Sequence, residues 1–192
     1  MIPYNTLLKY WFGIGLAILI IGVQASPMAI QELLLYDRPL IFEGQLWRII
    51  TAHICHLGWS HLLMNLLGLI MVMLFFGNYL SNWIWLLILL LGMIGTSLLL
   101  LLFNPDMVWY VGLSGVLHTL FIAGGIADIQ HRPKEAYIFL LLIIAKLCWE
   151  QFYGPLPGSE ATAGGNVIVD AHFYGAIFGL FIVPILFISK SK

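Results

Sequence analysis

Long apolar segments separated by short polar breaks run along almost the whole chain. No Asp, Glu, Lys or Arg occurs between Arg48 and Asp106, and that stretch is too long for one membrane-spanning helix, which needs about 20 residues. Residues 77–82, Gly-Asn-Tyr-Leu-Ser-Asn, offer a turn in its middle. We therefore predict six membrane-spanning segments, all helical because backbone polar groups in lipid must be satisfied within the segment. The predicted spans are about 7–24, 61–79, 83–103, 112–128, 136–152 and 171–188.

The composition favours an all-α integral membrane protein with a single domain, residues 1–192. Hydrophobic residues make up 61% of the chain, charged residues only 9%, and the mean hydropathy is +0.99. A soluble domain of this size has too little interior to hide so much apolar surface. The net charge of −1 argues against a nucleic-acid partner. Only Lys9 precedes the first apolar run, so we expect an uncleaved span there rather than a signal peptide.

The distribution of Lys and Arg predicts that both termini are cytoplasmic. On the outer side, Arg38 and Arg48 are diluted by acidic residues. The outer loop 25–60 combines aromatic residues with few charges, as expected of a segment lying in the membrane interface. The outer loop 153–170 is rich in Gly and Pro and is predicted to form a mobile cap. The basic residues on the cytoplasmic side are Lys9, Arg132, Lys134, Lys190 and Lys192.

Ser114 is the first candidate for chemistry among the few polar residues in the predicted spans, which are functional candidates by default. It stands in Gly112-Leu113-Ser114-Gly115 at the start of a predicted helix. The flanking glycines allow close backbone approach, and a helix start leaves N–H groups without partners. Those are the groups that an oxyanion needs. The alternative is a small packing or capping residue.

A nucleophilic serine needs a base, and His172 is the candidate. Gly175 and Gly179 follow it on a face that permits tight helix packing. His118 is a rival base because it lies four residues after Ser114 on the same helix face. Asp170, two residues before His172, cannot face it on a helix and is predicted to be the N-cap of the last span. A Ser–His dyad is therefore expected rather than a triad.

His61 and Asn65 are spaced i, i+4 and share one face of the second predicted span. Both can donate hydrogen bonds, so they can complete an oxyanion hole with the backbone of Ser114. The alternative is a buried polar pair that bonds other helices. His53 and His56 are expected to anchor loops.

Four segments together resemble the rhomboid intramembrane proteases, in the order typical of that family. The resemblance covers about residues 40–187 and implies a six-helix bundle whose short fourth helix starts at the catalytic serine. It implies Ser114 as nucleophile and His172 as general base, a cap over the site, and a gate between helices two and five. His61 and Asn65 would stabilise the oxyanion, supported by Gly112, Leu113 and His118. The segments are 46–48 (Leu-Trp-Arg), 56–65 (His-Leu-Gly-Trp-Ser-His-Leu-Leu-Met-Asn), 112–115 (Gly-Leu-Ser-Gly) and 171–179 (Ala-His-Phe-Tyr-Gly-Ala-Ile-Phe-Gly).

Two positions depart from the commoner rhomboid pattern. Many rhomboids have an aromatic residue at the place of His118, stacked on the catalytic histidine, and some have another glycine at the place of Val111. Gly-Leu-Ser-Gly-Val-Leu-His is similar to the rhombosortase subfamily. That resemblance implies substrates with a C-terminal Gly-Gly motif, a transmembrane helix and a basic tail. It also implies a bacterial inner membrane with the active site open to the periplasm.

The two cysteines, Cys55 and Cys148, are too few for a disulfide framework and by themselves allow either one bridge or two free thiols. Within the rhomboid resemblance both lie at the outer ends of helices. We therefore hypothesise a disulfide that tethers the two sides of the gate.

Other functions remain possible at this point. Histidines on different helices could ligate haem in a redox protein. A zinc protease lacks support because His-Glu-x-x-His is absent from the sequence. An ordinary rhomboid protease with another substrate, an inactive relative that only binds, and a transpeptidase using the same residues also stay open. For the protease we expect no cofactor and no metal, and only substrate proteins and membrane lipid as partners.

Overall fold

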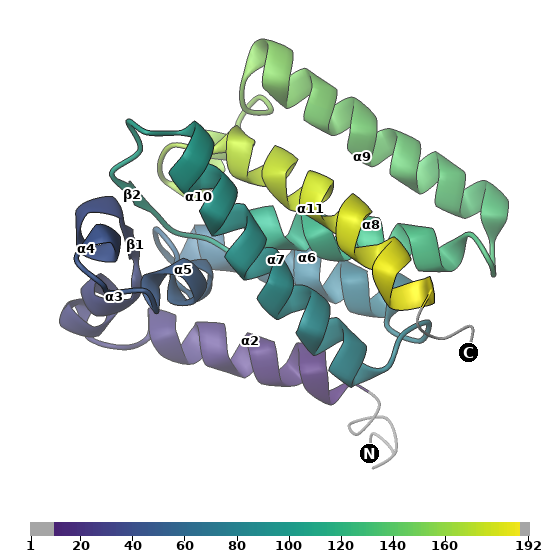
Figure 1. Cartoon of the computed structure of the whole chain (residues 1–192), viewed down its shortest axis with the longest axis horizontal. Helices are drawn as coiled ribbons and strands as arrows, with labels where there is room; N and C mark the ends of the chain where they lie inside the picture. The colour runs from purple at the N-terminus through teal and green to yellow at the C-terminus, as the bar shows by residue number, and fades with distance from the viewer. Residues whose placement is uncertain (1–9, 189–192) are drawn as a thin grey trace.

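Six helices of the computed structural model coincide with the six predicted apolar segments and run up and down in one bundle (Figure 1). The structure describes residues 10–188, with side chains described up to residue 182. Residues 7–9 of the first predicted span lie outside the described part. The six helices are α2 (Trp11–Gln24), α6 (Trp59–Phe76), α7 (Asn82–Phe103), α8 (Ser114–Asp128), α9 (Pro133–Tyr153) and α11 (Val169–Ile188).

Three of these helices, α6, α7 and α9, are long and apolar enough to cross a membrane. The helix α2 and the part of α11 up to Ile182 are apolar but shorter. The count of six spans therefore remains a prediction. Burial also differs among the three long helices: the most apolar windows of α6 and α7 are 39% and 44% buried, whereas that of α9 is only 17% buried. The helix α9 is thus the outermost of the three.

The helix α8 is the centre of the bundle and begins at Ser114, as predicted. Its side chains join those of α2, α6 and α7 in the main apolar core, and its other side packs on α11. Fifteen residues give a helix of about 22 Å, shorter than the hydrocarbon layer of about 30 Å. Ser114, the first residue of α8, can therefore lie inside the bundle rather than at its end. The loop before Ser114 must then enter the bundle between the other helices.

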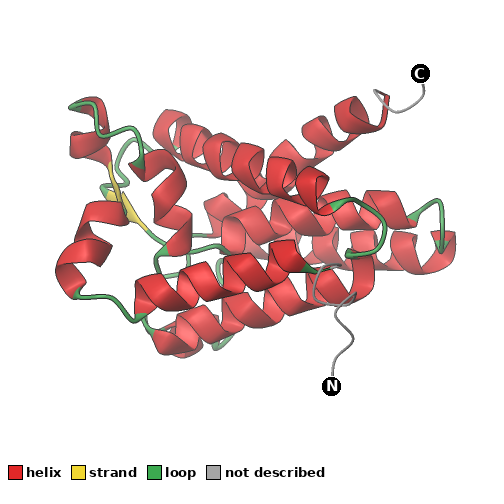
Figure 2. Ribbon diagram, turned by 90° about the horizontal axis from the view of Figure 1, so that it is seen from below, coloured by secondary structure: helices red, strands yellow, loops and turns green. Residues whose placement is uncertain are grey.

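A small subdomain built from the loop 25–58 covers one end of the bundle (Figure 2). Its helices are connected to the segment before α8 by a two-stranded antiparallel ladder in which Tyr36 pairs with Tyr110. The buried guanidinium of Arg48 donates to the carbonyls of Glu32 and Leu35, at 2.9 and 2.6 Å. This subdomain therefore fixes the position of the segment that leads into Ser114. Its elements are α3 (Met28–Leu34), β1 (Tyr36–Asp37), α4 (Arg38–Phe42), α5 (Arg48–Thr51), η1 (Ala52–Ile54) and the partner strand β2 (Trp109–Tyr110).

The predicted cap, residues 153–170, lies at the same end and contains one short helix, α10 (Ser159–Ala163). Gly154, Gly158 and Gly164 have φ angles of +83°, +81° and +77°, which only glycine adopts without strain. These turns bring the segment back over the bundle, where it joins α11.

Candidate active site

Ser114 and His172 meet where α8 and α11 cross. The Nε2 atom of His172 lies 2.9 Å from Oγ of Ser114, and the histidine side chain is buried. The two helices approach closely because Gly175 lies against the carbonyl of Gly115, where a Cβ would not fit. Thr119 secures the crossing by donating to the carbonyl of Gly175, at 2.8 Å. The glycine face after His172 therefore meets Gly115 through Gly175, and Gly179 lies against Thr119 and Ile122.

The pair opens into a cavity of about 280 Å³. The helices α6, α8 and α9 supply much of its wall, including the apolar side chains of Met64, Leu117 and Phe121. The cap supplies another part of the lining through Leu156, Ser159, Ala163, Asn166, Val167 and Ile168. Residues 153–170 thus cover the site, as predicted for a cap.

His61 is placed to donate a hydrogen bond beside the serine. Its Nδ1 accepts from the backbone N–H of Leu57 at 3.3 Å, so the proton of the neutral ring is on Nε2. That Nε2 edge lies against Gly112, at a distance of 3.0 Å from where a Cβ would stand. Asn65 lines the same cavity, and its amide also donates to the carbonyl of His61 at 2.9 Å. The structure brings both residues to the site.

The loop before Ser114 depends on Gly112, whose φ angle of +125° favours glycine. Its N–H donates to the carbonyl of Ala52 at 3.2 Å, and its own carbonyl accepts from the hydroxyl of Tyr110 at 2.8 Å. The side chain of Leu113 is fully buried in the core and is not among the residues that line the cavity.

His118 stacks on His172, with ring centroids 4.5 Å apart and planes 23° from parallel. Its Nε2 accepts from the ammonium of Lys146 at 2.9 Å, because an ammonium group can only donate. Its Nδ1 therefore carries the proton and donates to the carbonyl of Ser114 at 2.7 Å. Both nitrogens of His118 are thus engaged, and its arrangement is that of a supporting ring rather than of a base.

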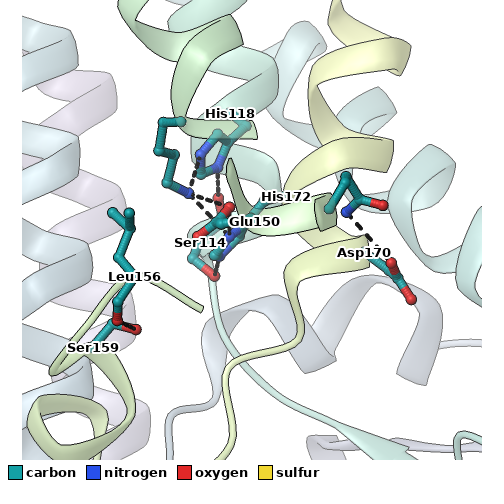
Figure 3. A network of polar contacts seen from close by, with 9 residues as sticks. Ser114, His118, Glu150, Leu156, Ser159, Asp170 and His172 are labelled. Atoms are coloured by element: carbon teal, nitrogen blue, oxygen red, sulfur yellow. Dashed lines mark hydrogen bonds and ion pairs between the residues drawn. The ribbon is translucent and has the colours of Figure 1, made fainter. Parts of the chain in front are cut away.

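Two charged residues of α9 that the sequence analysis passed over complete the cluster (Figure 3). Oε2 of Glu150 lies 2.9 Å from Nδ1 of His172 and 2.7 Å from Nζ of Lys146. The carboxylate side chain is only 2% exposed. The signal was available in the sequence, since Lys146 and Glu150 are an i, i+4 pair in an otherwise apolar span.

Asp170 points away from this cluster, as Figure 3 shows. Its carboxylate accepts from the amides of Asn104, at 2.5 Å, and Gln151, at 3.5 Å. The prediction that it does not face His172 is confirmed. The predicted N-cap role is wrong, because α11 already begins at Val169 and places Asp170 in the first turn. There its negative charge favours the helix through the dipole.

His53 and His56 lie outside the long helices, and burial lowers the pKa of His53 to about 4 and that of His56 to about 3. His53 lies within hydrogen-bonding distance of Ser97 Oγ and of the carbonyls of Met93 and Gly112, so it anchors the loop as expected. Neither ring nitrogen of His56 has a partner among the described residues. Its ring instead lies edge-on to His61, which orients that side chain.

Both cysteines are free thiols, so the hypothesised disulfide is absent from the structure. Cys55 is buried, with its sulfur near the carbonyls of Thr51 and Gln31. Cys148 is exposed on α9, in a lateral groove that also touches Ile144 and Phe152. The two thiols therefore face different surroundings.

His118, Glu150 and His172 offer ligand atoms within 4.8 Å of one another, close enough for a metal ion. The ammonium of Lys146 lies against all three, at 2.9, 2.7 and 3.1 Å, and supplies a cation at that point. Both ring nitrogens of His118 and both of His172 lie within hydrogen-bonding distance of protein atoms, so neither histidine has a ring nitrogen left over for a haem iron.

A serine hydrogen-bonded to a buried histidine, with donors beside it, is typical of a serine hydrolase. The Rhomboid domain matches residues 43–189 of the chain. The match covers most of the chain, which therefore belongs to the rhomboid family, and membership implies a serine intramembrane protease. No curated protein matches the sequence.

Proposed function

We propose that the chain is a rhombosortase-type intramembrane protease in which Ser114 is the nucleophile and His172 the general base. The observation that carries the proposal is the 2.9 Å contact between Oγ of Ser114 and Nε2 of His172 inside the capped cavity. Because the carboxylate of Glu150 can only accept, the proton of neutral His172 is on Nδ1. The lone pair of Nε2 then faces the hydroxyl, as a base requires.

The reaction follows from these positions. Oγ of Ser114 bonds the carbonyl carbon of the substrate while its proton passes to Nε2 of His172. The developing oxyanion accepts hydrogen bonds from His61, Asn65 and the backbone N–H groups in the first turn of α8, which have no acceptor within the helix itself. The proton then passes from Nε2 to the leaving nitrogen, the C–N bond breaks, and an acyl-enzyme remains. Water releases it by the same steps in reverse order.

The substrate class rests on the motif Gly112–His118 and its setting. His118 stacks on His172 where many rhomboids have an aromatic ring. We propose that the substrates carry a C-terminal Gly-Gly motif, a transmembrane helix and a basic tail. Because glycine has no side chain, an extended Gly-Gly segment of the substrate would meet few steric clashes beside Ser114 and under the cap. The proposed setting is a bacterial inner membrane, with both termini cytoplasmic and the site open to the periplasm.

The test is cleavage of a reporter with a Gly-Gly tail in vesicles, with mass spectrometry of the new C-terminus. Ser114→Ala and His172→Ala should both abolish cleavage, and Ser114→Ala should also abolish labelling by a fluorophosphonate. Ser60→Ala, on the exposed start of α6, is the matched control. Replacing Gly-Gly in the reporter by Val-Val should stop cleavage; unchanged cleavage would contradict the substrate class and leave an ordinary rhomboid protease. The mass of the product also separates a free carboxylate from an amide made by transfer.

A further inference from the structure

We propose that Glu150 is the positioning residue for His172, so that the site works as a Ser114–His172–Glu150 triad with Lys146 as the counter-ion of the carboxylate. This inference rests on the proposed function. Three helices contribute: α8 brings the serine, α11 the histidine and α9 both charges (Figure 3).

Glu150 decides which tautomer His172 adopts. Nδ1 of His172 has two charged neighbours, Glu150 Oε2 at 2.9 Å and Lys146 Nζ at 3.1 Å. The carboxylate needs a proton on Nδ1, whereas the ammonium needs a lone pair there. The carboxylate contact is the shorter, and it alone leaves Nε2 free to accept the proton of Ser114. Without Glu150, Lys146 would donate to Nδ1, and a proton on Nε2 would then face the serine.

Glu150 also balances the charge that develops on His172 during the reaction. Proton transfer from Ser114 creates an imidazolium at His172, which is buried and lies beside the cation of Lys146. In a site of low dielectric that repulsion is strong, and the adjacent carboxylate of Glu150 offsets it. Lys146 in turn pairs with Glu150 at 2.7 Å, which lets a buried carboxylate remain ionised.

The other carboxylate near His172 along the chain is engaged elsewhere. Asp170 is close in sequence to His172 but accepts from Asn104 and Gln151. Among the acidic residues of the described chain, Glu150 is the one for which a contact with His172 is observed.

The test compares full-length variants in detergent and in vesicles by the rate of fluorophosphonate labelling, by kcat and KM on the Gly-Gly reporter, and by thermal unfolding. Glu150→Gln keeps the size of the side chain and removes its charge. We expect kcat to fall by up to about 10⁴-fold, the loss found when a triad carboxylate is replaced by an amide, with KM changed less than about threefold. Glu135→Gln, an exposed carboxylate on the same helix, is the control.

The double variant Lys146→Met/Glu150→Leu separates catalysis from structure. A buried ion pair can often be exchanged for apolar residues without loss of stability, so a purely structural pair would leave kcat unchanged in this variant. We expect the double variant to unfold at a temperature near that of the wild type and yet to react at least about tenfold more slowly. It should also be faster than Glu150→Gln, since Lys146 no longer holds the wrong tautomer.

A folded double variant with the kcat of the wild type would overturn the proposal, and so would a fully active Glu150→Gln. In either case Ser114→Ala and His172→Ala should still be inactive. If Ser114→Ala itself cleaves the reporter, it is the proposed function that fails.

Discussion

Gly175 of α11 lies directly on the carbonyl of Gly115 in α8, so the backbones of the two helices are in contact at this point. Gly115 directly follows Ser114, and Gly175 lies three residues, about one helical turn, after His172, so the crossing is close to both residues that react. The distance between nucleophile and base therefore depends on the lack of a side chain at both Gly115 and Gly175, which lets the two helices approach.

Gly175→Ala should separate α8 from α11. The new methyl group would collide with the carbonyl of Gly115, a part of the backbone that cannot move aside. We expect a loss of about 1–3 kcal/mol in stability, as for an overpacked core, and a larger loss of fluorophosphonate labelling, because a shift of about 1 Å at the reacting atoms costs on the order of 10²-fold. Gly15→Ala in α2, where the methyl meets nothing, should leave both measurements unchanged. Full labelling of Gly175→Ala would contradict the tight crossing.

His61→Leu and Asn65→Leu test the oxyanion donors. Each should lower kcat about 10²–10³-fold, because a donor aimed at the developing charge acts mainly in the transition state. KM for the reporter should change little. If instead KM rises and kcat holds, the two residues bind substrate or serve as the buried polar pair considered above. Steady-state kinetics on the Gly-Gly reporter distinguish the two results.

His118→Phe tests whether His118 only supports the ring of His172 or is itself the general base. Phenylalanine keeps a ring stacked on His172 and loses the bonds to Lys146 and to the carbonyl of Ser114. We expect most of the activity to remain, with a stability loss of about 1–3 kcal/mol from unsatisfied buried groups. His118→Ala, which removes the ring altogether, should be less active than His118→Phe. Complete inactivity of a folded His118→Phe would make His118 the base.

Gly112→Ala tests the loop before the nucleophile. Its φ of +125° costs about 1–3 kcal/mol for other residues, and a methyl there would also press on the ring of His61. Labelling should fall together with stability. Gly44→Ala imposes similar strain at φ +100° with nothing nearby. That control should lower stability and leave the labelling rate of the folded protein unchanged.

Much of the helical bundle could be predicted, because a helix in lipid requires a long apolar segment that is easily detected in the sequence. Residues 83–103 and 171–188 are almost the observed α7 and α11. The glycines around Ser114 and after His172 made these residues candidates, but it was the resemblance to the rhomboid family that singled them out. The ladder of Tyr36 with Tyr110 was not predictable, because two-residue strands leave no periodic pattern to recognise.

Glu150 was missed for a different reason. Near the end of a predicted span, Lys146 and Glu150 read as an ordinary i, i+4 pair at the edge of the membrane. Only the packing of α9 on α8 and α11 brings them beside His172, where Glu150 is buried and Lys146 is half-buried. The predicted disulfide was wrong for the opposite reason. Cys55 and Cys148 were both expected at the outer ends of helices and therefore close together, whereas Cys148 lies on the exposed side of α9.

The position of α9 has a consequence for how the site can be entered. It is the least buried of the three long helices, and it carries the carboxylate that contacts His172. Any chain that entered by pushing α9 outward would break that contact by the same movement. Opening of the bundle at α9 and completion of the charge cluster are therefore mutually exclusive. While α9 is displaced, Glu150 is separated from His172, and the contact forms again only when α9 packs back against the bundle.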